Sequence, residues 1–225
     1  MTGEEQPKGP APIDPATIRF EPARPDQAET AAELIWATGY EIFGYNYGDK
    51  DLFVRAMVQS WPKPDSIFSH KATQAAYSDD QLIGIELSYT NKSIEERVPA
   101  HLAALAEALT EEEAALVNTR WPTIAPIVPE IPDGAYYLSN LAALPQAQGR
   151  GVGYRLLTNS FNRAKQDGFD WVLLDVCSRK PAVRFYQQVG MTPLVETRLP
   201  QLEEPFDVPM HIRMGMKLSD WQDNS

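Results

Sequence analysis

Three glycines lie within five positions of the stretch "QGRGVG": Gly149, Gly151 and Gly153. An amphipathic stretch of helical periodicity follows them directly. Glycine has no Cβ, so backbone N–H groups in such a loop can approach a ligand closely. The first turn of a helix also leaves its N–H groups unpaired and carries the positive end of the helix dipole. The stretch therefore predicts an anion site, most often one for phosphate.

Three glycine motifs compete for this stretch. A P-loop requires Gly-Lys-Ser/Thr, but Tyr154 follows Gly153. The dinucleotide fingerprint G-x-G-x-x-G fits poorly, because the spacing here is G-x-G-x-G and the preceding strand comes late in the chain. A dinucleotide-binding enzyme stays a remote alternative. The third motif, Gln/Arg-x-x-Gly-x-Gly/Ala, is the acyl-CoA loop of the GCN5-related N-acetyltransferases (GNAT), and residues 148–153 match it.

The segment 137–191 resembles the core of the GNAT family over two separate motifs. A strand "LSNLAALP", the glycine loop, a helix and the strand "WVLLDV" follow in the family's order. The segment "PAVRFYQQVGM" is similar to the family's A-x-x-x-Y-x-x-x-G-F ending, with Met191 in place of Phe. The resemblance implies the GNAT fold, acetyl-CoA as co-substrate and no metal.

The resemblance also implies which residues hold acetyl-CoA. The loop amides would bind the pyrophosphate, and the strand before the loop would open so that its backbone pairs with pantetheine. The family usually has Asn three residues before Ala182, where this chain has Arg179; an arginine could reach a phosphate instead. The predicted cofactor residues are Leu141, Ala142, Ala143, Gln148, Gly149, Arg150, Gly151, Val152, Gly153, Arg179 and Ala182.

Two residues are candidates for moving protons while an amine attacks the thioester. Tyr186 occupies the tyrosine of the second motif, and a neutral phenol with a pKa of ~10 can donate to a departing thiolate. The alternative is a tyrosine that only packs in the core. Glu86 in "IGIELSY" is the one carboxylate nominated as general base, against the alternative of an outward-facing strand glutamate.

The acceptor site is expected beside the fourth strand and the aromatic segment 39–48. Tyr45, Tyr137 and Ser139 are the candidates, although packing explains the aromatic residues about as well. The histidines at 70, 101 and 211 are scattered without ligand spacing, so we expect no metal. We place His101 on a solvated helix face and His211 on an outward strand face. We expect Cys177 to be a small buried residue rather than a nucleophile.

The elements that position these residues predict an α/β fold around one mixed sheet, with a helical insertion between the third and fourth strands. Capping boxes at Asp26/Glu29, Ser93/Glu96 and Thr110/Glu113 predict helix starts. We interpret the insertion, 93–130, as a lid over the acceptor cleft; an elaboration that only stabilises the core is the alternative. The expected order is strand 17–23, helix 25–39, aromatic loop 39–48, helix 51–61, a hairpin turning at 78–80, the insertion, strand 135–145, a helix to 167, strand 169–176, helix 181–190 and strand 209–218.

Composition narrows the class of protein. The 225 residues include 31 acidic and 20 basic side chains, and this net charge of −11 argues against a nucleic-acid surface. No apolar run reaches membrane-spanning length and no signal-peptide pattern is visible, so we expect a cytoplasmic protein without a membrane partner. We expect a disordered tail at 1–16 and a single domain at 17–225, with a homodimer left possible. The predicted function is acetyl transfer from acetyl-CoA to a small-molecule or peptide amine; the alternative is a non-catalytic acyl-CoA-binding module.

Overall fold

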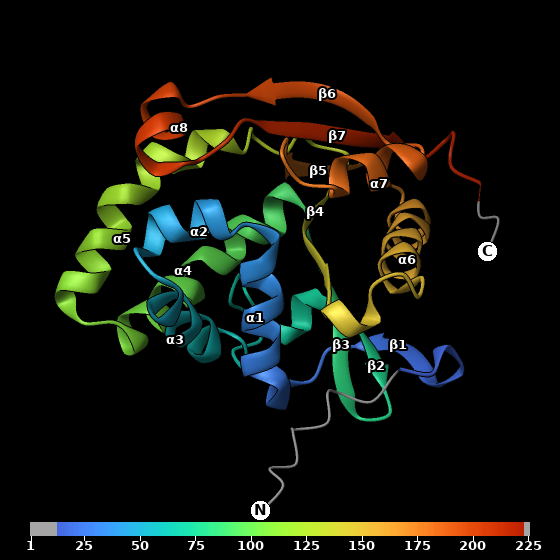
Figure 1. Cartoon of the computed structure of the whole chain (residues 1–225), viewed down its shortest axis with the longest axis horizontal. Helices are drawn as coiled ribbons and strands as arrows, with labels where there is room; N and C mark the ends of the chain where they lie inside the picture. Colours follow the sequence, from blue (N-terminus) through green and yellow to red (C-terminus); the bar gives the residue numbers. More distant parts are fainter. Residues whose placement is uncertain (1–12, 223–225) are drawn as a thin grey trace, which may run out of the picture.

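The fold is built on a seven-stranded mixed sheet with the strand order β1-β2-β3-β4-β5-β7-β6 (Figure 1). The computed structural model describes residues 13–222. The β4–β5 pair is parallel and all the other neighbouring strands are antiparallel. The strands are β1 (Ile18–Pro22), β2 (Thr73–Ser78), β3 (Gln81–Tyr89), β4 (Ala135–Ala143), β5 (Trp171–Cys177), β6 (Thr192–Thr197) and β7 (His211–Lys217).

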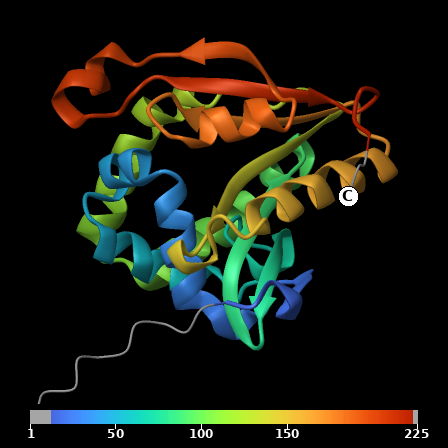
Figure 2. The same cartoon turned by 45° about the vertical axis from the view of Figure 1, so that its right-hand side comes forward.

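Helices cover both faces of this sheet (Figures 1 and 2). α1 packs on β3 and β4 from one side; α2 and α3 pack on α1, and α5 and α4 pack on these two helices in turn. α6 packs on the opposite face, where its buried side chains share a cluster with α7. This arrangement confirms the predicted α/β fold with one mixed sheet. The helices are α1 (Ala28–Thr38), α2 (Tyr40–Tyr47), α3 (Lys50–Ser60), α4 (Asn91–Ala108), α5 (Glu111–Ile124), α6 (Val152–Gln166), α7 (Ala182–Gln188) and α8 (Pro200–Phe206).

The β4 and β5 strands pair over a short length and then part. Their register runs from Ala135 opposite Trp171 to Tyr137 opposite Leu173, and no later pair joins them in the described chain. A β-bulge at Ser139 disturbs the other edge of β4, because Leu138 pairs with Ser88 while Asn140 pairs with Leu87. The described part of β4 beyond the bulge therefore has no ladder partner on the side of β5.

The bulge also changes which side chains of β4 meet each layer. Before it, Leu138 packs with residues of α6 and α7. After it, the Asn140 amide donates a hydrogen bond of 2.7 Å to Thr38 at the end of α1. One extra residue in the strand thus brings α1 to the place where the strands separate.

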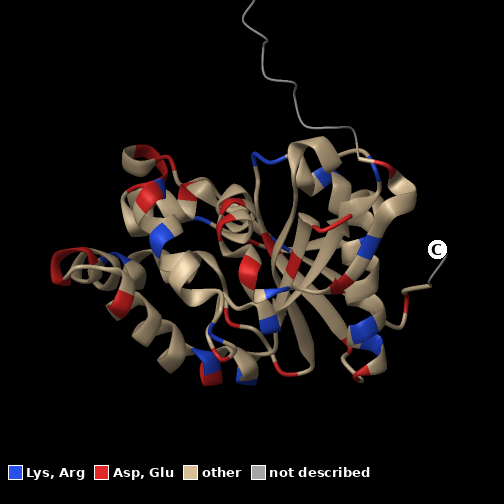
Figure 3. Ribbon diagram, turned by 90° about the horizontal axis from the view of Figure 1, so that it is seen from below, with Lys and Arg blue, Asp and Glu red and all other residues tan. Residues whose placement is uncertain are grey.

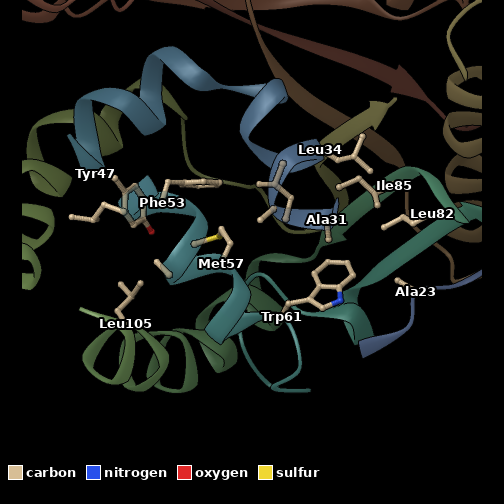
Figure 4. Packing of buried hydrophobic residues seen from close by; sticks show 14 of the residues in the cluster. Ala23, Ala31, Leu34, Tyr47, Phe53, Met57, Trp61, Leu82, Ile85 and Leu105 are labelled. Carbon is tan, nitrogen blue, oxygen red and sulfur yellow. The ribbon is translucent and has the colours of Figure 1, made fainter. Parts of the chain in front are cut away.

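A large hydrophobic cluster fixes α1 and α3 against β2 and β3 (Figure 4). Ala31 of α1 and Phe53 and Met57 of α3 are almost completely buried. The Trp61 indole N–H, just after α3, donates to the Arg24 carbonyl at 2.8 Å, so this aromatic side chain is satisfied inside the core. The rigid packing holds the C-terminal end of α1 beside β4.

The helical insertion lies between β3 and β4, as the sequence indicates. α4 packs on α3, and α5 packs on α2. The predicted box of Thr110 and Glu113 caps α5. α4 begins earlier than expected, since Thr90 and Ser93 form its capping box instead of Ser93 and Glu96.

Several other local predictions need correction. The aromatic segment is the helix α2, because Tyr47 and neighbouring side chains pack inward, and not a loop. The box of Asp26 and Glu29 does not form, since a 3-10 turn at Pro25–Gln27 precedes α1. β6 and α8 were absent from the prediction.

The N-terminal boundary also differs from the prediction. Residues 1–12 of the predicted disordered tail lie outside the described residues. At the end of that tail Ile13 is buried beside Val152 and Leu156, and Pro15–Thr17 form a 3-10 turn. The fold therefore begins before residue 17, because an apolar side chain there finds a place in the core.

Candidate active site

A cavity of about 220 Å³ opens where β4 and β5 part. It combines backbone-rich walls from β4 with side chains from the end of α1, from β5 and from α7. Seven of the residues predicted for the site line it: Ser139, Leu141, Ala142, Ala143, Gln148, Ala182 and Tyr186. The other lining residues are Ala37, Thr38, Leu138, Leu174, Asp175, Val176 and Lys180.

The glycine loop leads from this cavity into α6. Gly149 and Gly151 have φ angles of 73° and 79°, the left-handed region that glycine adopts without strain. A Cβ placed on either of them, or on Gly153, would meet no atom within 4 Å. The loop therefore leaves open space in front of the first N–H groups of α6, which suits an anion such as a pyrophosphate.

Side chains hold the loop in this shape. Gln148 donates from Nε2 to the Ala143 carbonyl at 3.4 Å, and Arg150 donates from Nε to the Gln146 carbonyl at 3.1 Å. Val152 is buried and packs over Gly84 of β3, where an added Cβ would lie 2.8 Å from its Cγ1. Gly84 is therefore needed for close packing of the loop on the sheet.

Tyr186 lies on α7 at the wall of the cavity. Its side chain is buried, and this burial raises the pKa of its hydroxyl well above the usual value for tyrosine. The group is therefore protonated at neutral pH. A neutral hydroxyl at this wall has the proton that a general acid must give.

Glu86 lies elsewhere than the prediction required. Its carboxylate is fully buried against α6, where it is ion-paired with Arg163 and accepts a hydrogen bond of 3.0 Å from Ser160. It does not line the cavity. Alternation along β3 directs this side chain to the α6 face, where it fastens the helix to the sheet, away from the cavity beside which the general base was expected.

Asp175 of β5 is the acidic residue among those that line the cavity, and its side chain is 2% exposed. It forms a close ion pair with Arg213 of β7, whose Nη2 lies 2.7 Å from Oδ2. Arg213 also donates to the carbonyls of Glu130 and Pro129, and its guanidinium lies 5.7 Å from the centre of the Tyr137 ring. A charged residue inside the otherwise apolar strand "WVLLDV" was the sequence signal for this pair.

Tyr137 belongs to this buried group rather than to the cavity lining. Burial raises the pKa of its hydroxyl well above the usual value, and the nearby Asp175 carboxylate raises it further. The side chain packs with Ile131 and Leu173. Tyr137 therefore packs beside Asp175, on the side of β4 where the insertion lies.

Arg179 does not line the cavity and is ion-paired with Asp207 at the end of α8. This pair directs the guanidinium to the β6–β7 connection, away from the cavity where the resemblance placed a cofactor ligand. Its neighbour Lys180 lines the cavity instead. Tyr45, a predicted acceptor residue, also lies outside the lining and packs edge to face on Phe206, with ring centres 4.9 Å apart.

Two histidines are buried where the sequence suggested exposure. His101 lies between α3 and α4 with Nδ1 3.3 Å from the Ser60 hydroxyl, and burial lowers its pKa to about 4. His211 is buried at the start of β7, where Nδ1 lies 3.0 Å from the Pro209 carbonyl. α4 packs on α3 at His101, and β7 lies between β5 and β6; local periodicity does not show such contacts between elements. Cys177 is a free, buried cysteine, as expected.

The insertion does not contribute to the cavity lining among the described residues. It packs on the outer helices α2 and α3, so its geometry favours scaffolding over the predicted lid.

Charged positions of both signs are interspersed along the ribbon seen in Figure 3. In the described part of the chain we find no cluster of three or more His, Cys, Asp or Glu side chains that could hold a metal ion. None of the described helices is both long and apolar enough to cross a membrane.

The parted strands β4 and β5 and the glycine loop at the start of α6 are the two features of an α/β fold that the resemblance in the motifs implies. Residues 101–191 match the sequence model of the acetyltransferase (GNAT) family. This match confirms, for residues 101–191, the family resemblance that the motifs predicted. A search of curated proteins found no match to the sequence.

Solved structures share the fold. An N-acetyltransferase from Staphylococcus aureus Mu50 aligns with a TM-score of 0.68 and 18% identity, over 88% of this chain and 100% of that one. A further acetyltransferase structure aligns with a TM-score of 0.63 and 14% identity, over 89% and 99% of the two chains. A GNAT-family protein described as a putative acetyltransferase, from Desulfovibrio desulfuricans, gives a TM-score of 0.54 at 14% identity, over 89% and 99%. At sequence identities of 14–18%, the structural similarity establishes the fold alone.

Proposed function

We propose that this protein transfers the acetyl group of acetyl-CoA to a primary amine by direct attack within a ternary complex. The observation that carries the proposal is the cavity between the parted strands β4 and β5, with Tyr186 in its wall and the glycine loop at its edge. Acetyl transfer agrees with the family match of residues 101–191. The thioester supplies the activated acetyl group; the protein must orient two reactants and move protons.

The residues that would hold acetyl-CoA fall into two groups. The N–H groups of residues 149–153 suit the pyrophosphate, because the open space before α6 admits it without a clash. The free edge of β4 at 141–143 suits the amide groups of pantetheine, which would pair with it as an added strand. An N–H beside the bulge at Ser139 would polarise the thioester carbonyl.

Proton movement would involve Tyr186 and Asp175. Tyr186 gives its proton to the leaving thiolate, since burial keeps the hydroxyl protonated in the resting protein. Asp175 replaces Glu86 as the candidate that takes the proton of the attacking amine, directly or through water, because it is the acidic residue among those that line the cavity. Arg213 would hold the Asp175 carboxylate in place throughout.

Two measurements test this function. Calorimetry with CoA and, separately, with NAD distinguishes an acyl-CoA site from a dinucleotide site. We expect CoA to bind and NAD not to bind. Release of free thiol from acetyl-CoA is then followed across a panel of amines, with the protein omitted as a blank. Amine-dependent thiol release supports the enzyme. CoA binding without release by any amine would instead favour a non-catalytic acyl-CoA-binding module.

A further inference from the structure

The C-terminal end of α1 forms part of the cavity wall at the place where β4 and β5 part. Its last two residues, Ala37 and Thr38, line the cavity together with residues of β4, β5 and α7. The last four carbonyl groups of an α-helix have no partner within the helix. The carbonyls of Ala37 and Thr38 belong to this set, so donors from outside α1 must satisfy them.

Lys180, between β5 and α7, supplies those donors from the opposite wall of the cavity. Its Nζ donates to the Thr38 carbonyl at 2.6 Å and to the Ala37 carbonyl at 3.1 Å. The same Nζ lies 3.5 Å from Oε2 of Glu41 and 4.9 Å from the centre of the Tyr40 ring, both in the first turn of α2. A positive charge is also favourable at the C-terminal end of a helix. One ammonium group therefore joins the end of α1 and the start of α2 to the β5–α7 connection.

Thr38 is also bound from the other parted strand. Asn140 of β4 donates from Nδ2 to the Thr38 hydroxyl at 2.7 Å. That hydroxyl in turn donates to the Ile35 carbonyl at 2.6 Å, one turn back along α1. The end of α1 is thus hydrogen-bonded to β4 through a side chain and to the segment after β5 through Lys180. These bonds fix α1 relative to both strands at the point where the strands separate.

Stability alone does not explain a lysine at this position. The Lys180 side chain is 17% exposed, and moving an ammonium group out of water costs free energy that an apolar side chain of similar length would not lose. Replacing a buried ion pair with apolar residues is often neutral or stabilising. What the lysine adds over an apolar residue is a set of directed donors that hold two carbonyls of the cavity wall.

We propose that Lys180 is a positioning residue, which holds the end of α1 across the β4–β5 opening and so shapes the acceptor side of the cavity. The residues proposed for acetyl-CoA, 141–143 and 148–153, lie on β4 and at the start of α6, away from this contact. Lys180 therefore affects the amine rather than CoA, because a poorly oriented acceptor reacts slowly. This inference rests on the proposed function, since it concerns the acceptor side of the same cavity.

Lys180→Met tests the effect on the amine, because it keeps the length of the side chain and removes its charge and donors. The kcat/KM for the most active amine of the panel, which includes ethylenediamine, should fall ~10-fold or more, the loss expected for hydrogen bonds from a charged group. The Kd for CoA, measured by calorimetry, should stay unchanged. Lys180→Arg keeps a cation with donors and should recover part of the loss. An unchanged kcat/KM, or an equal loss of CoA affinity, would overturn the inference.

Hydrogen exchange tests whether Lys180 acts by holding α1. The Gly39 amide donates to the Trp36 carbonyl at 3.1 Å and the Phe43 amide to the Gly39 carbonyl at 2.9 Å, so both bonds lie at the junction of α1 and α2. In the protein without ligands, Lys180→Met should speed the exchange of these two amides ~10-fold or more, because the junction opens more readily. A lysine that only contacted the amine would leave both rates unchanged, and that result contradicts the inference.

Lys50→Met is the matched control. Lys50 also tethers α1, through an ion pair with Glu33 at 2.5 Å, but both side chains are about half exposed and neither residue lines the cavity. The control should leave the kcat/KM for the amine and the exchange of the Gly39 and Phe43 amides unchanged. Losses as large as those of Lys180→Met would show that any weaker tether of α1 has the same effect, which would overturn the specific role of Lys180.

The exchange measurement also distinguishes failure of the inference from failure of the proposed function. If acetyl-CoA binds but no amine of the panel releases thiol, the proposed function fails. Exchange needs no turnover and then decides the inference: faster exchange in Lys180→Met alone supports it, and unchanged exchange overturns it. If Lys180→Met does not fold, Lys180→Gln, which keeps an N–H donor without the charge, replaces it with changes expected in the same directions.

Discussion

Replacing Gly153 with glutamate should make the protein more stable while weakening its affinity for CoA. Gly153 is the second residue of α6, it does not have a positive φ, and an added Cβ would meet no atom within 4 Å. It therefore differs from Gly151, whose φ of 79° makes any larger residue strained. The side chain of Gly153→Glu would extend into the space proposed for the pyrophosphate.

The two effects have opposite signs and can be worked out separately. Glutamate is favoured over glycine in a helix by ~0.5–1 kcal/mol, and a carboxylate in the first turn adds a few tenths. A gain of ~1 kcal/mol raises Tm by ~2–4 °C in a chain of this size. Loss of two N–H contacts to a charged ligand costs at least ~3 kcal/mol, so CoA should bind ~100-fold more weakly or worse.

Calorimetry with CoA and a thermal unfolding scan on the same preparations measure both quantities. Gly153→Ala is the matched control, because it should keep most of the stability gain without a carboxylate and with a smaller loss of affinity. Wild-type affinity in a stable Gly153→Glu protein would refute the assignment of the loop. A large fall in Tm would refute the argument that the space in front of α6 is open.

Three further predictions concern single side chains. Tyr186→Phe keeps the ring but removes the proton donor, so kcat should fall ~10²–10⁴-fold with little change in acetyl-CoA binding; unchanged turnover with chemistry rate-limiting removes it from the mechanism. Glu86→Gln leaves Arg163 without its buried partner, so the free energy of unfolding, measured by denaturant titration, should fall by ~3 kcal/mol. If Glu86 were instead the general base, the folded variant would lose turnover while its stability stayed unchanged. His101, whose pKa falls from an unfolded value of ~6.5 to about 4 on folding, binds a proton more readily when unfolded. The free energy of unfolding should therefore drop by up to ~3 kcal/mol as the pH falls from 6.5 to 4, and His101→Gln should flatten that pH dependence.

Most of the correct predictions came from motifs that span a short stretch of the sequence. The run from the strand before the glycine loop to Met191 places each element in local order, so its helices and strands follow from periodicity and from Pro181 and Gly190 at the ends of a helix. The glycine positions with positive φ are also visible in the sequence, because few other residues tolerate that backbone.

It was harder to predict which side of its strand or helix a residue faces. Glu86 and Asp175 are both strand carboxylates, but Glu86 pairs with Arg163 of α6 whereas Asp175 pairs with Arg213 of β7 beside the cavity. His101 has the sequence environment of an exposed helix and is buried because α4 packs on α3. Contacts between elements far apart in the chain decide these cases, and a single sequence does not reveal them.

The acceptor side of the cavity depends on the same long-range contacts. Lys180 binds carbonyls of Ala37 and Thr38 that lie more than a hundred positions away in the sequence. Nothing in the local pattern around Lys180 predicts this contact, and the motif drew attention to Arg179 instead.

The central claim is acetyl transfer to an amine without an acetylated protein on the way. Acetyl-CoA labelled in its acetyl group is mixed with the protein and ethylenediamine in a single turnover, quenched and analysed by mass spectrometry. We predict that the label leaves CoA and appears only on the amine, at a rate that depends on the amine concentration. Label that stays on CoA, is released as free acetate or accumulates on the protein before reaching the amine would contradict the account.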